Sequence, residues 1–341
     1  MKSLQTRICA ALSLAAFAVA PAAADSVADF YSGKTISMVM GTGPGGSFDL
    51  YGRTIAAHLS RHIPGNPGII MEHLPGAGGV IAGNHIYGTA PQDGTKMLLS
   101  HAITLAEKLE PTGVRFETAK MQWLGAYDAI AQMMAMWHTA PAQSIADLKT
   151  KEGVVIRSFA RSHLTYHWAS LLKDAIGAKY KIITGLRSGN DNNLAMERGE
   201  IHGWTASWEN LMGTRPTWVP EKKVNLLVQF TMARKPYLKD VPTLIELASP
   251  EKRDVAEFVI SGTPISRAIA VGPGVPADRV AALRKAFEET MKDPAFLADC
   301  EKRKLSIDPT SHQELHAMIK KIVAASPELV ARVKKGIGQI E

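Results

Sequence analysis

Two glycine-rich loops are the segments of this sequence best suited to binding chemistry. The first is Gly41-Thr-Gly-Pro-Gly-Gly-Ser-Phe-Asp49 and the second is Pro75-Gly-Ala-Gly-Gly79. Glycine lets the backbone approach a ligand closely, and a helix starting after such a loop offers free N–H groups and a positive dipole end to an anion. We expect Ser47 to be the N-cap of that helix. One such loop is often only a tight turn, but two in succession predict a polar cradle.

The first loop also satisfies a dinucleotide-binding pattern. Gly41, Gly43 and Gly46 have the G-x-G-x-x-G spacing, and Glu72 ends the next predicted strand, near where an acid would hold a ribose. Pro44 removes one backbone donor from this loop, however, and the second glycine loop falls where the ribose would lie. The sequence therefore argues against a dinucleotide, and we expect no cofactor.

The sequence carries only weak signals for a metal site or a catalytic site. His58 and His62 are four residues apart, as are His163 and His167, a spacing found in zinc sites. Neither pair has the glutamate of H-E-x-x-H, and Ser47 does not stand in G-x-S-x-G. No nucleophile, base and orienting acid can be assembled by pattern, so we expect no metal and no enzyme, with a secreted hydrolase as the weaker alternative.

The elements that must position these loops follow a βαβ rhythm, which indicates parallel strands with right-handed crossovers. The first set has predicted strands and helices at residues 35–40, 50–61, 68–71, 80–88 and 96–100. The second set has predicted elements at residues 153–158, 164–176, 179–183, 201–205 and 224–229. His101 directly follows the strand 96–100, so it either faces the ligand at the same sheet edge or is an ordinary loop histidine.

The C-terminal third predicts one strand at 267–271, followed almost entirely by helices. Ser311 and Glu314 form a capping-box pattern at the start of one of them. A lone strand with helices makes a poor domain, so we expect this part to return to the first sheet. The predicted division is domain 1 from residues 25–124 and 254–341, and domain 2 from residues 125–253.

The N-terminus has the pattern of a secretory signal peptide over residues 1–24. Lys2 and Arg7 precede an apolar run that is too short to span a bilayer, and the small residues before Asp25 predict cleavage after Ala24. Cys9 would be lost with this segment, leaving Cys300 alone and no internal disulfide. About 300 residues would remain, which exceeds the usual size of a single core and predicts two domains.

The charge pattern excludes one class of partner. The formal net charge is +7 at pH 7, but the basic residues are spread along the chain. Nucleic-acid binding would require a clustered basic patch. We therefore expect no nucleic-acid partner.

Several motifs together resemble the periplasmic receptors of tripartite tricarboxylate transporters, the Bug family. The matching segments, in chain order, are Gly43-Pro-Gly-Gly-Ser-Phe-Asp49, Leu74-Pro-Gly-Ala-Gly-Gly79, Pro91-Gln-Asp-Gly-Thr95, Gly189-Asn-Asp-Asn-Asn-Leu-Ala-Met-Glu-Arg-Gly-Glu200, Asp240-Val-Pro-Thr-Leu244 and Gly272-Pro-Gly-Val-Pro-Ala277. They span essentially the whole chain after residue 24. The resemblance implies a type II-like periplasmic binding protein, with two α/β domains joined by crossing strands and a ligand cleft between them.

The resemblance also implies which residues hold a small organic acid. In this family, main-chain amides and hydroxyls of the first two loops bind the carboxylate, and the second domain closes over it. By position, the implied ligand-binding residues are Gly45, Gly46, Ser47, Asp49, Ala77 and Gly78 from the first domain, and Arg161, Ser162, Ser207 and Trp208 from the second. Asp49 would lie close to an anion, which makes sense only if its carboxylate bonds to backbone, water or a ligand donor.

One segment departs from the family pattern. Ser158-Phe-Ala-Arg-Ser162 stands where many relatives carry more glycine. Arg161 adds a guanidinium that is able to pair with a second carboxylate, although a solvated surface charge is an equal alternative. The implied protein is a monomeric periplasmic receptor that delivers its ligand to integral-membrane transporter subunits. A sensory module serving a signalling receptor is the alternative.

Overall fold

The computed structural model describes residues 26–340, except 101–102, 130, 162 and 186–187. The predicted signal peptide lies outside this range, as do the candidate ligand contacts His101 and Ser162. No helix within the described part of the chain combines the length and the apolar character needed to cross a membrane.

The described chain forms two separate β-sheets. Across the first, sheet A, the strands are β11 (Thr310–Ser311), β4 (Gln122–Ala126), β10 (Ala268–Val271), β3 (Lys96–Leu99), β1 (Thr35–Met40) and β2 (Gly68–His73). Strand β1 is parallel to β2 and β3, as the βαβ rhythm predicted, but β10 is antiparallel to both of its neighbours. The strand predicted at 267–271 thus completes the first sheet.

The second sheet, sheet B, is also mixed. Its strands, in order, are β7 (Lys181–Ile183), β6 (Val155–Arg157), β8 (Gly203–Ser207), β5 (Gln132–Trp137) and β9 (Val224–Gln229). Strand β6 is parallel to β7 and β8, whereas β5 is antiparallel to β8 and β9. The α/β fold class predicted from the sequence is confirmed, but the strands β4 and β5 were not predicted.

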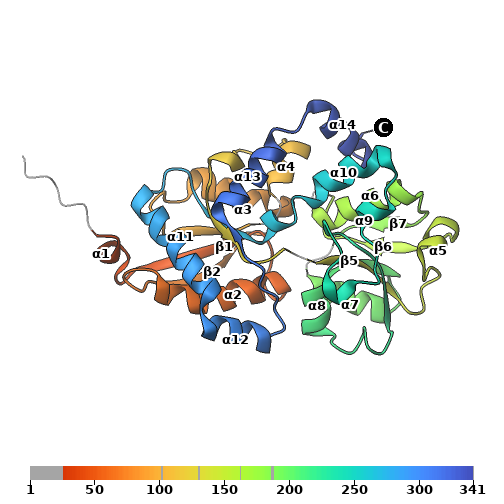
Figure 1. Cartoon of the computed structure of the whole chain (residues 1–341), viewed down its shortest axis with the longest axis horizontal. Helices are drawn as coiled ribbons and strands as arrows, with labels where there is room; N and C mark the ends of the chain where they lie inside the picture. Colours follow the sequence, from red (N-terminus) through yellow and green to blue (C-terminus); the bar gives the residue numbers. More distant parts are fainter. Residues whose placement is uncertain (1–25, 101–102, 130, 162, 186–187, 341) are drawn as a thin grey trace, which may run out of the picture.

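Helices cover both sheets, and each sheet with its helices forms a lobe (Figure 1). Lobe A, on the left of the figure, holds α1 (Val27–Tyr31), α2 (Ser47–Leu59), α3 (Val80–Asn84), α4 (Ile103–Leu109), α11 (Ala277–Lys292), α12 (Pro294–Lys302) and α13 (His312–Val323). Lobe B, on the right, holds α5 (Ile145–Thr150), α6 (Leu164–Ile176), α7 (Gly189–Glu197), α8 (Trp208–Thr214), α9 (Leu244–Leu247) and α10 (Pro250–Ile260).

Short helical turns link several of these elements. They are η1 (Ser60–His62), η2 (Ala77–Gly79), η3 (His85–Thr89), η4 (Thr118–Lys120), η5 (Pro236–Leu238) and η6 (Pro264–Arg267). The capping box predicted from Ser311 and Glu314 is present at the start of α13.

Two stretches of chain connect the lobes. One follows β4 of sheet A and leads to β5 of sheet B. The other leaves α10, which packs on α6 and α9, and passes through η6 into β10. We propose these two connections as the crossing segments, a few residues beyond the positions near 124 and 254 expected from the sequence.

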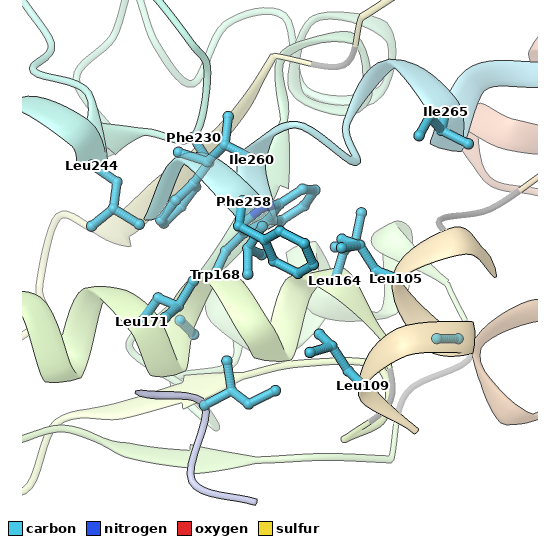
Figure 2. Close-up of a cluster of buried hydrophobic side chains, with 14 of the residues drawn as sticks. Leu105, Leu109, Leu164, Trp168, Leu171, Phe230, Leu244, Phe258, Ile260 and Ile265 are labelled. Atoms are coloured by element: carbon cyan, nitrogen blue, oxygen red, sulfur yellow. The ribbon is translucent and has the colours of Figure 1, made fainter. Parts of the chain in front are cut away.

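The lobes are packed against each other behind the crossings. Helix α14 (Pro327–Gly336) contacts α4 of lobe A and both α6 and α10 of lobe B. Figure 2 shows Leu105 and Leu109 of α4 next to Leu164 on α6, with Trp168 farther along the same helix. These side chains belong to one buried cluster that runs through both lobes. The structure is therefore that of two lobes in contact rather than two separated bodies.

Candidate functional site

A cavity lies where the two lobes meet. The residues lining it are Thr42, Gly43, Gly46, Ser47, Phe48 and Gly78 from lobe A, Gln132, Phe159, His163, Leu164, Thr165, Trp168, Ser188, Gly189, Trp204, Ser207 and Asn210 from lobe B, and Ser266 and Arg267 from the second crossing. Its volume is about 80 Å³ for the centres of water-sized molecules, and about 10–15 Å³ is enough to hold one water. The space therefore suits a small molecule.

The first glycine loop forms part of the lobe A wall. The helix that follows it begins earlier than predicted, because Gly46 rather than Ser47 is the N-cap of α2, without a side-chain capping bond. The prediction that Ser47 is the N-cap is therefore wrong. Ser47 is instead the first helical residue, and it lines the cavity beside Gly46.

Asp49 holds this loop in place. Its Oδ2 accepts hydrogen bonds from the backbone N–H of Gly45 at 3.1 Å and from Nε of Arg53 at 3.0 Å. Its Oδ1 lies 3.2 Å from Nε2 of His73, whose Nδ1 donates to the carbonyl of Thr42 at 2.9 Å. The buried carboxylate thus bonds within the loop, as the sequence required of an acid near an expected anion site. The Gly45 amide is consequently engaged within the loop.

The second glycine loop has an unusual backbone conformation with positive φ angles. Gly76 has φ +142° and a Cβ there would lie 2.5 Å from Cδ1 of Ile81. Ala77 has φ 45°, an uncommon value for a residue with a side chain. This turn brings Gly78 to the cavity wall, whereas Ala77 itself is not among the lining residues.

The lobe B residues suggested by the resemblance divide into two groups. Ser207 lines the cavity and caps α8 by accepting a hydrogen bond from the N–H of Asn210. Trp208 lies outside the lining and packs on Tyr237, with ring centres 4.9 Å apart. Arg161 is exposed, also outside the lining, and its guanidinium lies 5.9 Å from the ring centre of Tyr166.

Arg267 is the charged residue among those lining the cavity that sequence reasoning missed. Its side chain is 1% exposed, and its guanidinium carbon lies 4.4 Å from the ring centre of Tyr51 and 4.5 Å from that of Phe48. Nη2 lies 3.8 Å from Oε2 of Glu209, which is fully buried. Nε and Nη1 are buried without a hydrogen-bond partner. This buried cation lines the cavity and has two donor groups without a hydrogen-bond partner.

Two acidic groups, Glu209 and Asp128, lie near this guanidinium. Burial, reinforced by the nearby charge of Asp128, raises the pKa of Glu209 to about 7. Burial also raises the pKa of Asp128, whose Oδ2 accepts hydrogen bonds from Tyr51 and Ser306 at 3.3 and 3.1 Å. Neither carboxyl lines the cavity. Arg267 is thus the charged contact that the wall presents to a ligand.

The two histidine pairs singled out in the sequence lie in different surroundings. His58 and His62 lie near Asp299 and Asp293, with shortest nitrogen–oxygen distances of 3.2 and 2.8 Å. His163 lines the cavity at the start of α6, where burial and then the neighbouring His167 lower its pKa to about 4. His163 is therefore neutral at pH 7.

Comparison with known proteins gives one relative by sequence. No family model matches the chain. A curated protein of Cupriavidus necator described as "UPF0065 protein in gbd 5'region" is 28% identical over 261 residues, which cover 70% of this chain and 71% of that protein.

Solved structures give a broader match. BugD, described as a periplasmic binding protein, superimposes with a TM-score of 0.70 at 18% identity, covering 90% of this chain and 98% of BugD. The chain has the fold of the Bug and TctC binding proteins. This confirms the resemblance drawn from the sequence motifs and the two-domain periplasmic-binding-protein architecture.

Other proteins with this Bug-type fold carry ligands in their structures. Rpa4515 of R. palustris was solved with adipate and matches with a TM-score of 0.69 at 18% identity, covering 89% of this chain and 97% of that protein. MatC of Rhodopseudomonas palustris was solved with malate and matches with a TM-score of 0.67 at 17% identity, covering 89% and 99%. The neighbours named by function are binding proteins rather than enzymes.

Proposed function

We propose that this chain is a periplasmic solute-binding receptor that captures a small organic carboxylate and delivers it to a membrane transporter of the tripartite tricarboxylate type. The observation that carries the proposal is Arg267, a fully buried guanidinium with Nε and Nη1 unpartnered at a cavity enclosed by both lobes. Buried polar groups normally have partners, so donors of this kind point to a missing acceptor. A carboxylate matches the geometry of adjacent guanidinium N–H groups.

The glycine loops supply the second half of the proposed anion site. Gly46, Ser47 and Gly78 line the cavity from lobe A and Ser207 lines it from lobe B, so amides and hydroxyls are available on both sides. We propose these four as ligand contacts together with Arg267. Gly45, Asp49 and Ala77 would act by shaping the loops, since Asp49 binds the Gly45 amide and neither Asp49 nor Ala77 lines the cavity.

The remaining candidate ligand-binding residues are not among the described residues that line the cavity. Arg161 and Trp208 lie outside the cavity wall of lobe B, and we propose that they affect entry or closure. His101 and Ser162 lie outside the described residues and stay predictions from the sequence.

Closure of the lobes is part of the proposed function. Nδ2 of Asn190 in α7 donates to the carbonyl of Gly45 at 3.4 Å, so lobe B touches the first glycine loop directly. The Arg267–Glu209 pair joins the second crossing to α8. A ligand favours this closed arrangement only through a higher affinity for it than for the open one. A carboxylate bound between Arg267 and the loops would provide that difference.

Export to the periplasm, action as a monomer and partnership with integral-membrane subunits are also proposed. They are supported by the signal-peptide pattern of residues 1–24 and by the periplasmic neighbours of the same fold. Cleavage after Ala24 is tested by determining the N-terminal residue of the exported protein.

A thermal-shift screen tests carboxylate binding. Ligand at a hundred times its dissociation constant stabilises a protein by about 2.7 kcal/mol, so a library of organic acids should contain members that raise Tm. The same acids should raise the Tm of Arg267→Gln much less, and that of Arg234→Gln as much as wild type, because Arg234 pairs with Glu246 away from the cavity. If only neutral or cationic compounds raised Tm, carboxylate binding would be disproved.

A further inference from the structure

The cavity wall carries very little charge. Among the described lining residues, Arg267 is the one Lys, Arg, Asp or Glu side chain. Polar contacts come otherwise from backbone, hydroxyls and amides, and His163 is neutral at pH 7 because burial lowers the pKa of its ring. An anion that enters this cavity therefore meets a single cation.

The charge of that cation is already partly compensated. Oε2 of Glu209 lies 3.8 Å from Nη2 of Arg267, and Asp128 is near enough to act on the same group. Neither acid is among the residues that line the cavity. The guanidinium thus has the unpartnered donors Nε and Nη1 for one carboxylate, and its charge already interacts with Glu209 and Asp128.

The largest side chains of the lobe B wall are apolar, and they stand among the polar side chains of Gln132, Thr165, Ser188, Ser207 and Asn210. The large apolar side chains are Phe159, Leu164, Trp168 and Trp204. Phe159 and Trp204 meet edge to face with ring centres 6.4 Å apart, and Trp168 stacks on Phe230 at 5.8 Å. Figure 2 shows Leu164 and Trp168 projecting from α6 into the buried cluster. Their positions are fixed by packing, so they form a stable surface for hydrocarbon.

We infer that the ligand is a monocarboxylate with an apolar body, its carboxylate on Arg267 and the glycine loops and its ring or alkyl chain against Phe159, Trp168 and Trp204. This inference rests on the proposed function and narrows its ligand class. A dicarboxylate would bury its second charge in a cavity whose described lining holds no second cation, which is strongly unfavourable. An acid without hydrocarbon would leave the aromatic wall unused.

Calorimetric titration with matched acids tests the inference. Hexanoate and adipate have the same chain length, and benzoate and terephthalate share the same ring, so each pair differs by one carboxylate. We expect at least one monocarboxylate to bind about tenfold or more tighter than its dicarboxylate and than acetate, where tenfold corresponds to about 1.4 kcal/mol. Equal or tighter binding of both dicarboxylates, or of acetate, would overturn the inference and leave the proposed function standing. Failure of every acid to bind would overturn both.

A variant tests whether charge compensation sets this preference. Glu209→Gln keeps the shape of the side chain but leaves more positive charge on Arg267, so it should narrow the preference for hexanoate over adipate several-fold. Glu72→Gln is the matched control, because Glu72 pairs with Lys96 outside the cavity lining, and it should keep the wild-type preference. An unchanged preference in Glu209→Gln would overturn the electrostatic basis of the inference.

Discussion

The two walls of the cavity differ in composition. The lobe A wall is made largely of backbone from two glycine loops, held by Asp49 and by turns with positive φ. The opposite wall holds Phe159, Trp168 and Trp204 among polar side chains, and the crossing segment supplies Arg267, the one charged side chain among the described lining residues. A hydrogen bond between neutral groups contributes about 0.5–1.5 kcal/mol, whereas one to a charged group contributes about 1.5–3 kcal/mol. The comparison therefore assigns shape to the loops and most of the anion affinity to Arg267.

The largest effect should come from removing that charge. Arg267→Gln is expected to weaken carboxylate binding by about 2–5 kcal/mol, roughly 30-fold or more, because a buried charged donor pair is lost. Isothermal titration calorimetry measures this change, with Arg234→Gln as the surface control. Near-wild-type affinity in Arg267→Gln would mean that the loops alone carry the affinity.

The next largest effect on stability and ligand affinity should come from changing the shape of the second glycine loop while keeping its polar groups. Gly76→Ala requires φ +142° and places Cβ against Ile81, so the free energy of unfolding should fall by about 1–3 kcal/mol and ligand affinity should fall with it. Gly43→Ala is the control, because Gly43 lines the cavity but a Cβ there meets nothing within 4 Å. Chemical denaturation and calorimetry on both variants would show whether the shape of the second loop matters.

A pH series tests the charge balance behind Arg267. Burial raises the pKa of Glu209 to about 7, so this carboxyl gains a proton as the pH falls from about 8 to 6 and ceases to compete for the guanidinium. Carboxylate affinity should therefore increase several-fold over that interval, while His163, with its pKa lowered to about 4, stays neutral. Glu209→Gln should flatten the profile. A profile that weakens toward pH 6 would contradict this charge balance.

The shifted pKa values of Glu209 and His163 also make the stability of the protein depend on pH. Because the pKa of Glu209 is higher in the folded than in the unfolded protein, its contribution to the free energy of unfolding falls as pH rises from about 4.5 to 7. His163 acts in the opposite direction between about pH 4 and 6.5, since its folded pKa is lowered. Denaturation of Glu209→Gln against wild type across this range separates the two groups.

The smallest effect should come from a single loop hydroxyl. Ser47→Ala removes one neutral donor from the cavity wall and should weaken binding by about 0.5–1.5 kcal/mol. Ser60→Ala is a useful control, because its hydroxyl bonds to the carbonyl of Pro67 away from the cavity. An effect of Ser47→Ala as large as that of Arg267→Gln would remove the distinction between the two walls.

Local sequence signals account for what was predictable in the fold. Strands β1 and β9 and helix α6 have the predicted bounds, because each is a strongly periodic or β-rich run between turn residues. Strands β4 and β5 were missed, since Gln122-Trp-Leu-Gly-Ala126 and Gln132-Met-Met-Ala-Met-Trp137 are rich in residues without strong β preference. Burial between neighbouring strands decides their conformation, and that is not a local property.

The residues of the candidate site also divide into those that local sequence signals predict and those that they do not. Gly46, Ser47 and Gly78 were predictable because glycine loops after strands carry their own signature. Arg267 and Glu209 are far apart in the chain and meet only after both lobes have folded. The available signal was the arginine itself, standing directly before the otherwise apolar strand β10 at the centre of sheet A.

The most direct test is to observe the guanidinium of Arg267 while a ligand binds. Its Nε–H is buried and unpartnered, so its proton–nitrogen NMR signal, assigned by its loss in Arg267→Gln, reports on this one donor. On titration with a carboxylate that binds, the Nε proton should move downfield as it enters a charge-assisted hydrogen bond. Saturating ligand that leaves this signal unmoved while other resonances shift would contradict the assignment of Arg267 as the carboxylate anchor.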